Sequence, residues 1–137
     1  RLAVKELQNG GVVIIFPSGA ISRAKRFVDK AVDPIWKKFV AKLATQSGTQ
    51  VLPFFIEGQN TPIFQFAIQC SQTLGYSLMF REICKRMYRP VNIQMRPIIT
   101  EQMIADINDR NKLIEKLRNI TYFGVDKPPI NMNKLSK

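Results

Sequence analysis

The sequence of 137 residues contains no histidine and only two cysteines, Cys70 and Cys84. Without histidine, the chain itself holds no Ser-His-Asp or Cys-His catalytic centre and no histidine-ligated metal site. Two cysteines without CxxC spacing form neither a metal-ligand cluster nor the disulfide framework of a small secreted domain, which favours a reduced, cytoplasmic setting. Free cysteines are usually buried, so we expect both thiols inside the fold. We predict no metal and no cofactor.

The sequence also lacks a long apolar run and the apolar region of a signal peptide. A helix that spans a membrane needs about 20 apolar residues, whereas the richest stretch, residues 62–80, is interrupted by several polar side chains. Any contact with a membrane should therefore be peripheral.

Acidic residues are scarce, since 10 Asp and Glu stand against 21 Lys and Arg, a formal net charge of +11. Such a chain attracts polyanions: nucleic acid, an anionic bilayer, acidic carriers or phosphorylated small molecules. Its length and its hydrophobic fraction of 45% suffice for one domain with a core.

Three successive segments predict a strand, a helix and a second strand. Residues 12–16, "VVIIF", are continuously apolar and predict a strand buried on both faces. Asp33 as N-cap and Pro34 at the first helical position predict a helix that closes at Gly48. Residues 51–56 predict the second strand. This order is a βαβ unit, which implies parallel pairing and a right-handed crossover.

Further elements flank this unit. A first helix should end at the glycines after Asn9, and helices are expected over residues 62–71 and 78–87. Residues 91–96 alternate apolar and polar side chains, which predicts a strand with one wetter face. A terminal helical segment follows, and Asp109 is the point at which it can divide into two helices.

The first predicted strand leads into a small-residue turn followed by cations, "FPSGAISRAKR". Small side chains let backbone N–H groups approach an anion, and a guanidinium binds phosphate or carboxylate with two parallel bonds. We therefore predict an anion site at this turn, while a solvated basic connection is the alternative that the residues leave open. The predicted site consists of Phe16, Pro17, Ser18, Gly19, Ser22 and Arg23.

A second group of cations follows an apolar, aromatic stretch. Cations beside apolar side chains suit anionic lipid headgroups, each contributing about 1 kcal/mol near the surface, or the acidic surface of a carrier protein. The aromatic residues before them line either a core or an acyl-binding surface. The predicted membrane or carrier contact consists of Arg81, Lys85, Arg86 and Arg89.

Three sequence blocks occur in the order "VVIIFPSGAISR", "DPIWKKFVAKLATQSG" and "VLPFFIEGQN". Together they resemble the glycerolipid (lysophospholipid) acyltransferase superfamily, in which a strand ends in Phe-Pro-Glu-Gly and a second strand ends near a Gly-x-Asn. With "LRNITY" near the end, the chain looks most similar to a bacterial branch of hemolysin-like proteins and ornithine-lipid acyltransferases. Ser18 replaces the glutamate of the first motif, and Ala20 stands where that branch tends to have an acidic residue. The family's His-(four residues)-Asp catalytic motif is absent.

The resemblance, over about residues 2–123, implies an α/β fold with a mixed, mainly parallel sheet flanked by helices. We expect residues 1–124 to be the C-terminal portion of such a domain, incomplete at its N-terminus, and residues 125–137 to be a flexible tail. The implied activity moves a fatty acyl chain from acyl carrier protein or coenzyme A onto the hydroxyl of a lysolipid, of lysophosphatidate or lyso-ornithine type. The implied location is cytoplasmic, on the inner face of the membrane.

The same resemblance implies that this chain supplies the acceptor-headgroup site, with Arg23 as the main anion contact, and no catalytic residue. The alternative is a non-catalytic basic module that binds nucleic acid or an anionic membrane. Nucleic acid is the less favoured partner, because the cations are scattered over several segments and no helix-turn-helix, zinc-finger or RNP motif is present.

Overall fold

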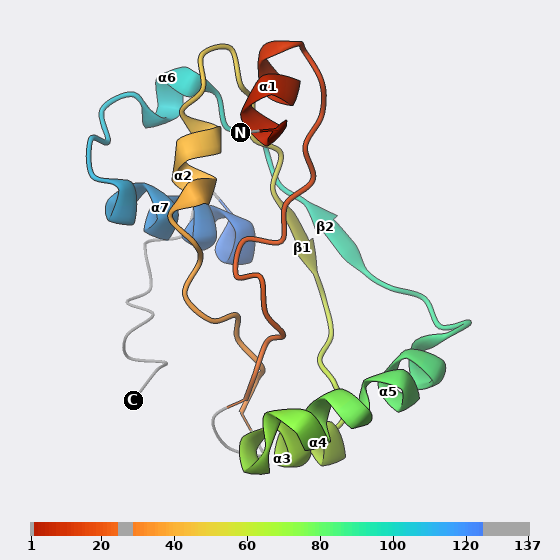
Figure 1. Ribbon diagram of the computed structural model, residues 1–137. Helices are drawn as coiled ribbons and strands as arrows, with labels where there is room; N and C mark the ends of the chain where they lie inside the picture. Colours follow the sequence, from red (N-terminus) through yellow and green to blue (C-terminus); the bar gives the residue numbers. More distant parts are fainter. Residues whose placement is uncertain (1, 25–28, 125–137) are drawn as a thin grey trace. The chain divides into compact units, whose positions relative to one another are not determined.

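The computed structural model describes residues 2–24 and 29–124, which form helices and one small two-stranded antiparallel sheet (Figure 1). The described residues divide into two compact units. Unit 1 takes those of Arg1–Gly19, Ile35–Phe55 and Ile93–Lys137, and unit 2 takes those of Ala20–Pro34 and Ile56–Asn92. The elements are α1 (Leu2–Gln8), α2 (Phe39–Ala44), β1 (Phe54–Ile56), α3 (Pro62–Cys70), α4 (Gln72–Ser77), α5 (Met79–Arg86), β2 (Ile93–Met95), α6 (Glu101–Ile104) and α7 (Arg110–Phe123).

Unit 1 is built around helices α2 and α7, which pack on each other. The Asp109 carboxylate accepts a hydrogen bond from the Asn111 backbone N–H at 2.8 Å and caps α7, so the predicted division at Asp109 is confirmed. Arg96, which follows β2, donates from Nε to the Thr121 carbonyl and from Nη2 to the Tyr122 carbonyl, both at 3.1 Å. A cation thus meets the carbonyls of the last turn of α7, where the helix dipole favours positive charge. The core comprises Trp36, Val40, Ala41, Ala44, Ile99, Ile104, Leu113, Ile114, Leu117 and Ile120.

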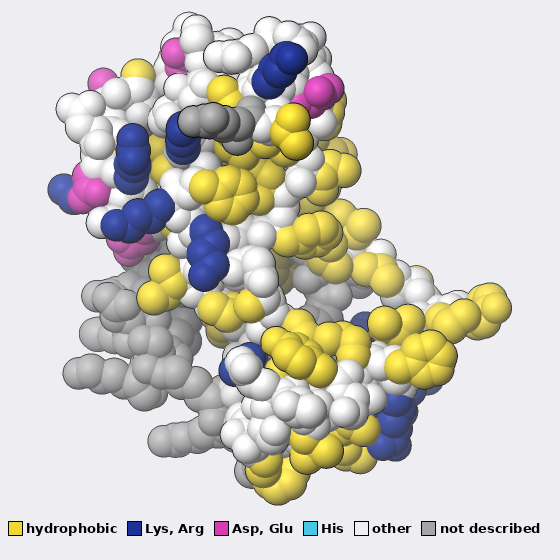
Figure 2. Space-filling model, in the orientation of Figure 1, with side chains coloured by type: hydrophobic (Ala, Val, Ile, Leu, Met, Phe, Trp, Pro, Cys, Tyr) yellow, Lys and Arg dark blue, Asp and Glu magenta, His cyan; other side chains and the backbone are white. Residues whose placement is uncertain are grey.

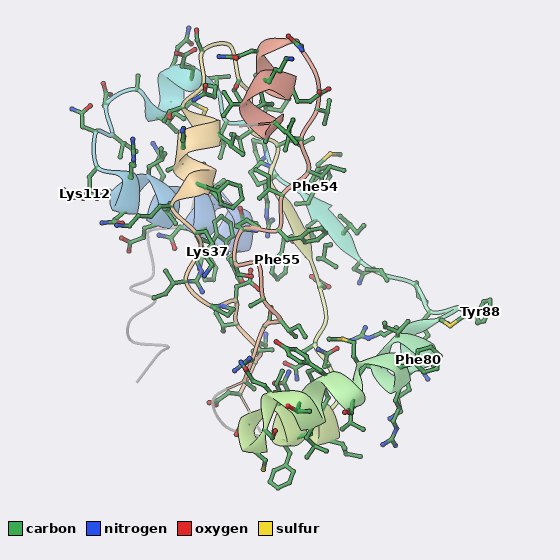
Figure 3. The ribbon with its side chains drawn as sticks, viewed as in Figure 1. Lys37, Phe54, Phe55, Phe80, Tyr88 and Lys112 are labelled. Atoms are coloured by element: carbon green, nitrogen blue, oxygen red, sulfur yellow. The ribbon has the colours of Figure 1, made fainter. Side chains whose placement is uncertain are left out.

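The sheet pairs β1 with β2 in antiparallel register. At one end Glu57 N–H donates to the Asn92 carbonyl at 3.0 Å, and at the other Arg96 N–H donates to the Pro53 carbonyl at 2.9 Å. Successive side chains point to opposite faces: Phe55 packs against Tyr122 in a tilted contact with ring centroids 5.3 Å apart, whereas Phe54 is half exposed (Figure 3).

The segment 12–16 was expected to be a buried strand, and that expectation is wrong. Val12, Ile14 and Phe16 are 86%, 84% and 76% exposed, and residues 12–15 make no backbone hydrogen bond to other described residues. Only Val13 and Ile15 are partly buried, so the segment is covered on one side. Accordingly, the described residues contain no parallel pairing between this segment and residues 51–56.

Helix α2 is shorter than expected at both ends: it begins at Phe39 rather than at Pro34, and it ends at Ala44, before Gly48. The Lys37 N–H donates to the Pro17 carbonyl at 2.9 Å, which ties residues before the helix to another part of unit 1. Asp33 does not cap this helix, since its carboxylate accepts the hydroxyl of Ser22. Ile35, expected on the buried stripe, is 84% exposed.

Unit 2 contains helices α3, α4 and α5. Helices α3 and α5 confirm the helices expected over 62–71 and 78–87, whereas α4 was not predicted. Thr61 caps α3, because its hydroxyl accepts the Phe64 N–H at 3.4 Å. A Cβ at Gly75 in α4 would lie 2.6 Å from the Cβ of Ile68 in α3. Only glycine therefore permits this close approach of the two helices.

Both cysteines lie on the surface, so the expectation of buried thiols is wrong. The α1 helix and its glycine end are confirmed, with Gly10 at φ 77°. The expected flexible tail, residues 125–137, lies outside the described residues. Among the described helices, none is long and apolar enough to cross a membrane.

Candidate functional site

The candidate site is an open pocket of about 280 Å³ within unit 2. It forms where the loop after β1 meets Ile21, Ser22 and Ala31 and the end of α5. Its polar groups belong to Ser22, Glu57, Gln59, Asn60 and Arg86. Its apolar part is made by Ile21, Ile56 and Val91, together with Ala31. A polar edge beside a branched apolar wall suits a ligand that is itself amphiphilic.

Arg86 is the cation of this pocket, and backbone contacts hold it there. Its Nη2 donates to the Gln59 carbonyl at 2.5 Å. A Cβ at Gly58 would lie 3.1 Å from both terminal nitrogens of the guanidinium, so glycine gives Arg86 the room that it needs. Gly58 also has φ 126°, a conformation that other residues rarely adopt. A guanidinium has five N–H groups in a planar fork, which leaves donors available for an anion.

The rest of the loop is fixed by side-chain hydrogen bonds. Gln59 Oε1 accepts the Ala31 N–H at 3.0 Å, and Asn92 Nδ2 donates to Glu57 Oε2 at 3.3 Å. Ser22 Oγ donates to Asp33 Oδ1, eleven positions further along the chain. Through its bond to Asn92, the Glu57 carboxylate helps to hold this loop in place.

The pocket has groups suited to binding a ligand: a guanidinium, a carboxylate, two amides and a hydroxyl. Ser22 is paired with a carboxylate, and the chain has no histidine to act as its base. Among the described residues, no three His, Cys, Asp or Glu side chains are grouped so that they could hold a metal ion. What the arrangement offers is one cation, Arg86, one acidic residue, Glu57, and several neutral hydrogen-bonding groups beside an apolar wall.

Two of the predicted site residues, Ser22 and Arg86, line this pocket, although they were predicted for two separate sites. Ser22 was predicted in the anion site and Arg86 in the membrane or carrier contact. Arg23, expected to be the main anion contact, does not line the pocket. Its backbone pairs with Val32 at 3.1 and 3.0 Å, and its Nε is buried without a hydrogen-bond partner in the described part of the chain.

The other four residues of the predicted anion site belong to unit 1. They do form the expected turn: Gly19 N–H donates to the Phe16 carbonyl at 3.0 Å, with Gly19 at φ 61°. Ser18 is buried, whereas the Phe16 side chain is exposed. The predicted six-residue site is therefore divided between the two units at Gly19.

Gln59 and Asn60 were not predicted as site residues. The signal that could have found them is their place beside Gly58 in the loop that follows β1, because such loops commonly position binding groups. A scan against models of protein families, a search of the curated proteins and a search of the solved structures found no match for this chain.

Proposed function

We propose that this chain is the acceptor-binding part of an acyltransferase, which moves a fatty acyl chain from acyl carrier protein or coenzyme A onto the hydroxyl of a lysolipid. The observation that carries the proposal is the meeting of Arg86 and Ser22 beside Ile21, Ile56 and Val91 in one pocket of unit 2. A phosphate or carboxylate headgroup would meet the guanidinium, and the adjoining part of the lipid would meet the apolar wall.

The chain lacks the histidine that would act as the general base of acyl transfer. Acyl transfer to a hydroxyl needs a general base within hydrogen-bond reach of that hydroxyl. The histidine that serves in the resembling family is absent from these 137 residues, so we assign the chain to binding and not to the chemical step. The proposal includes the family's mixed, mainly parallel sheet.

The first test is the binding of lysophosphatidate, compared with an uncharged monoacylglycerol, by titration calorimetry below the micelle concentration. We expect the phosphate compound to bind more tightly, and the substitution Arg86→Gln to weaken it about tenfold or more, as expected for a lost charged hydrogen bond of about 1.5–3 kcal/mol. Arg86→Lys should recover part of the affinity, because lysine keeps the charge but not the fork.

Arg110→Gln is the matched control, since Arg110 is an exposed residue of unit 1. Arg23→Gln separates the two candidate arginines: an equal or larger loss there, with Arg86→Gln unchanged, would contradict the pocket assignment. Because Arg86 also bonds the Gln59 carbonyl, circular dichroism must show that the variant remains folded. Tighter binding to duplex DNA of any sequence than to lysolipid, with a steep salt dependence, would favour the non-catalytic alternative.

A further inference from the structure

Helix α5 carries an apolar stripe that the described part of the chain leaves uncovered. Phe80, Ile83 and the C-cap residue Met87 follow one another at spacings of three and four residues, so they share one face of the helix. Their side chains are 76%, 54% and 50% exposed. Figure 2 shows hydrophobic side chains gathered over this end of unit 2, and Figure 3 labels Phe80 among them.

Cations border the stripe on both sides. Arg81 and Lys85, four residues apart, form the adjacent row next to Phe80, and Arg86 lies beyond Ile83 on the other side. Arg81, Lys85 and Arg86 are all exposed, and Arg89 follows the helix. An apolar stripe flanked by basic residues is the arrangement of a helix that lies in the plane of a membrane surface.

The buried side of α5 is held by an acidic residue, which orients the stripe outward. Glu82 is 5% exposed, and its carboxylate accepts the Thr61 backbone N–H at 2.7 Å and the Thr61 hydroxyl at 2.6 Å. These bonds tie α5 to the N-terminus of α3. The helix therefore cannot turn its apolar stripe inward without breaking them.

The residue after the helix strengthens the same interpretation. Tyr88 is 99% exposed and has φ 62°, and it is the one described residue other than glycine with a positive φ. An unfavourable backbone conformation that persists at a fully exposed aromatic residue points to a functional contact. Tyrosine, with its apolar ring and polar hydroxyl, is enriched at membrane interfaces.

We propose that α5 and the turn at Tyr88 dock unit 2 onto an anionic lipid bilayer, with Phe80, Ile83, Met87 and Tyr88 in the interface and Arg81, Lys85 and Arg89 on the headgroups. Charge decides for this occupant, because a neutral apolar partner would leave the bordering cations unmatched. Together with the apolar stripe, the cations match the two layers of a bilayer surface, anionic headgroups over acyl chains.

Continuity with the candidate site supports the same occupant. A second open pocket of about 340 Å³ is lined by Ile83 and Met87 of the stripe together with Met79, Glu82, Asn60 and Arg86. Asn60 and Arg86 also line the first pocket, so the two pockets adjoin. A lipid at the docking surface would thus lie next to the proposed headgroup cation. This proposal rests on the proposed function for its biological purpose, but docking itself requires no acyl transfer.

The test is sedimentation of the protein with vesicles of phosphatidylcholine alone or mixed with phosphatidylglycerol. We expect binding to the mixed vesicles, weakened about 25-fold by Arg81→Gln with Lys85→Gln, since each cation near the surface contributes about fivefold. Phe80→Ser should weaken it about tenfold through lost apolar burial. A Phe80→Trp variant should be quenched by brominated lipid more strongly than the buried Trp36 of the unsubstituted protein.

Matched controls come from unit 1. Lys37→Gln with Lys38→Gln removes the same charge, and Ile35→Ser removes an equally exposed apolar side chain. Equal losses in control and test pairs would overturn the proposal, as would an unquenched Phe80→Trp. Binding to acyl carrier protein but not to vesicles would assign the surface to the carrier instead. Vesicle binding without lysophosphatidate binding in the pocket would overturn only the proposed function.

Discussion

The two units of this chain are stabilised in different ways. Unit 1 has a continuous apolar core of ten buried residues between α2, α7 and the segments beside them. Unit 2 buries fewer apolar side chains, chiefly Phe64, Ala67 and Ile68, and relies on buried polar ones. Gln65 Oε1 accepts the Ala24 N–H at 3.0 Å, and Glu82 holds Thr61.

The difference separates stability from recognition. An apolar core excludes water and tolerates little change, whereas hydrogen bonds fix particular groups in particular places. Unit 2 holds the pocket and the exposed stripe of α5, and its loops are positioned by side chains such as Gln59 rather than by a large core. The stability of unit 1 should therefore fall most when buried apolar side chains are truncated, and that of unit 2 when buried hydrogen-bond partners are removed.

The largest effect should follow from Leu113→Ala in α7, because Leu113 is 1% exposed and lies in the core of unit 1. Truncating a buried leucine leaves a cavity and lowers the free energy of unfolding by about 2–5 kcal/mol. Urea unfolding followed by circular dichroism measures this value. Leu2→Ala is the control, since Leu2 is 87% exposed, and a similar loss there would contradict the proposed core.

A smaller effect is expected from Glu82→Gln in unit 2. The amide cannot accept both hydrogen bonds from Thr61, and an unmet buried polar group costs about 1–3 kcal/mol. Hydrogen exchange should show faster exchange in α3 and α5 than in α7. Glu115→Gln, on the exposed side of α7, is the control and should leave hydrogen exchange in all three helices unchanged. If Glu82→Gln accelerated exchange equally in both units, the distinction between them would be contradicted.

The smallest effect should come from Asp109→Ala, which removes the cap of α7 without touching the core. Loss of such a cap costs about 1 kcal/mol. The measurement is again the free energy of unfolding, with the exposed Asp106→Ala as the control. A loss as large as that of Leu113→Ala would mean that α7 depends on its cap more than on its packing.

Local signals in the sequence predicted most helices and both strands, β1 within residues 51–56 and β2 within residues 91–96, but not how the strands pair. Asp109 marks the start of α7, because caps act within one turn, whereas Asp33-Pro34 predicted the start of α2 too early. By contrast, the apolar segment 12–16 predicted a strand, yet strand formation needs a partner whose position no local pattern specifies. For the same reason, the prediction that the polar residues of β2 form its wetter face is wrong. Ile93 and Met95 are the exposed residues, while Gln94 and Arg96 are half-buried.

The sequence by itself determined the positive charge, the absence of a histidine catalyst, and the positions of helices whose caps and periodicity are local. It also predicted Ser22 and Arg86 as binding residues, although in separate sites. Only the tertiary structure decided that these two line one pocket, because they are 64 positions apart and the loop of Gly58 and Gln59 brings them together. It likewise removed Arg23 from that pocket, since pairing of its backbone with Val32 is a contact that its own sequence context does not predict.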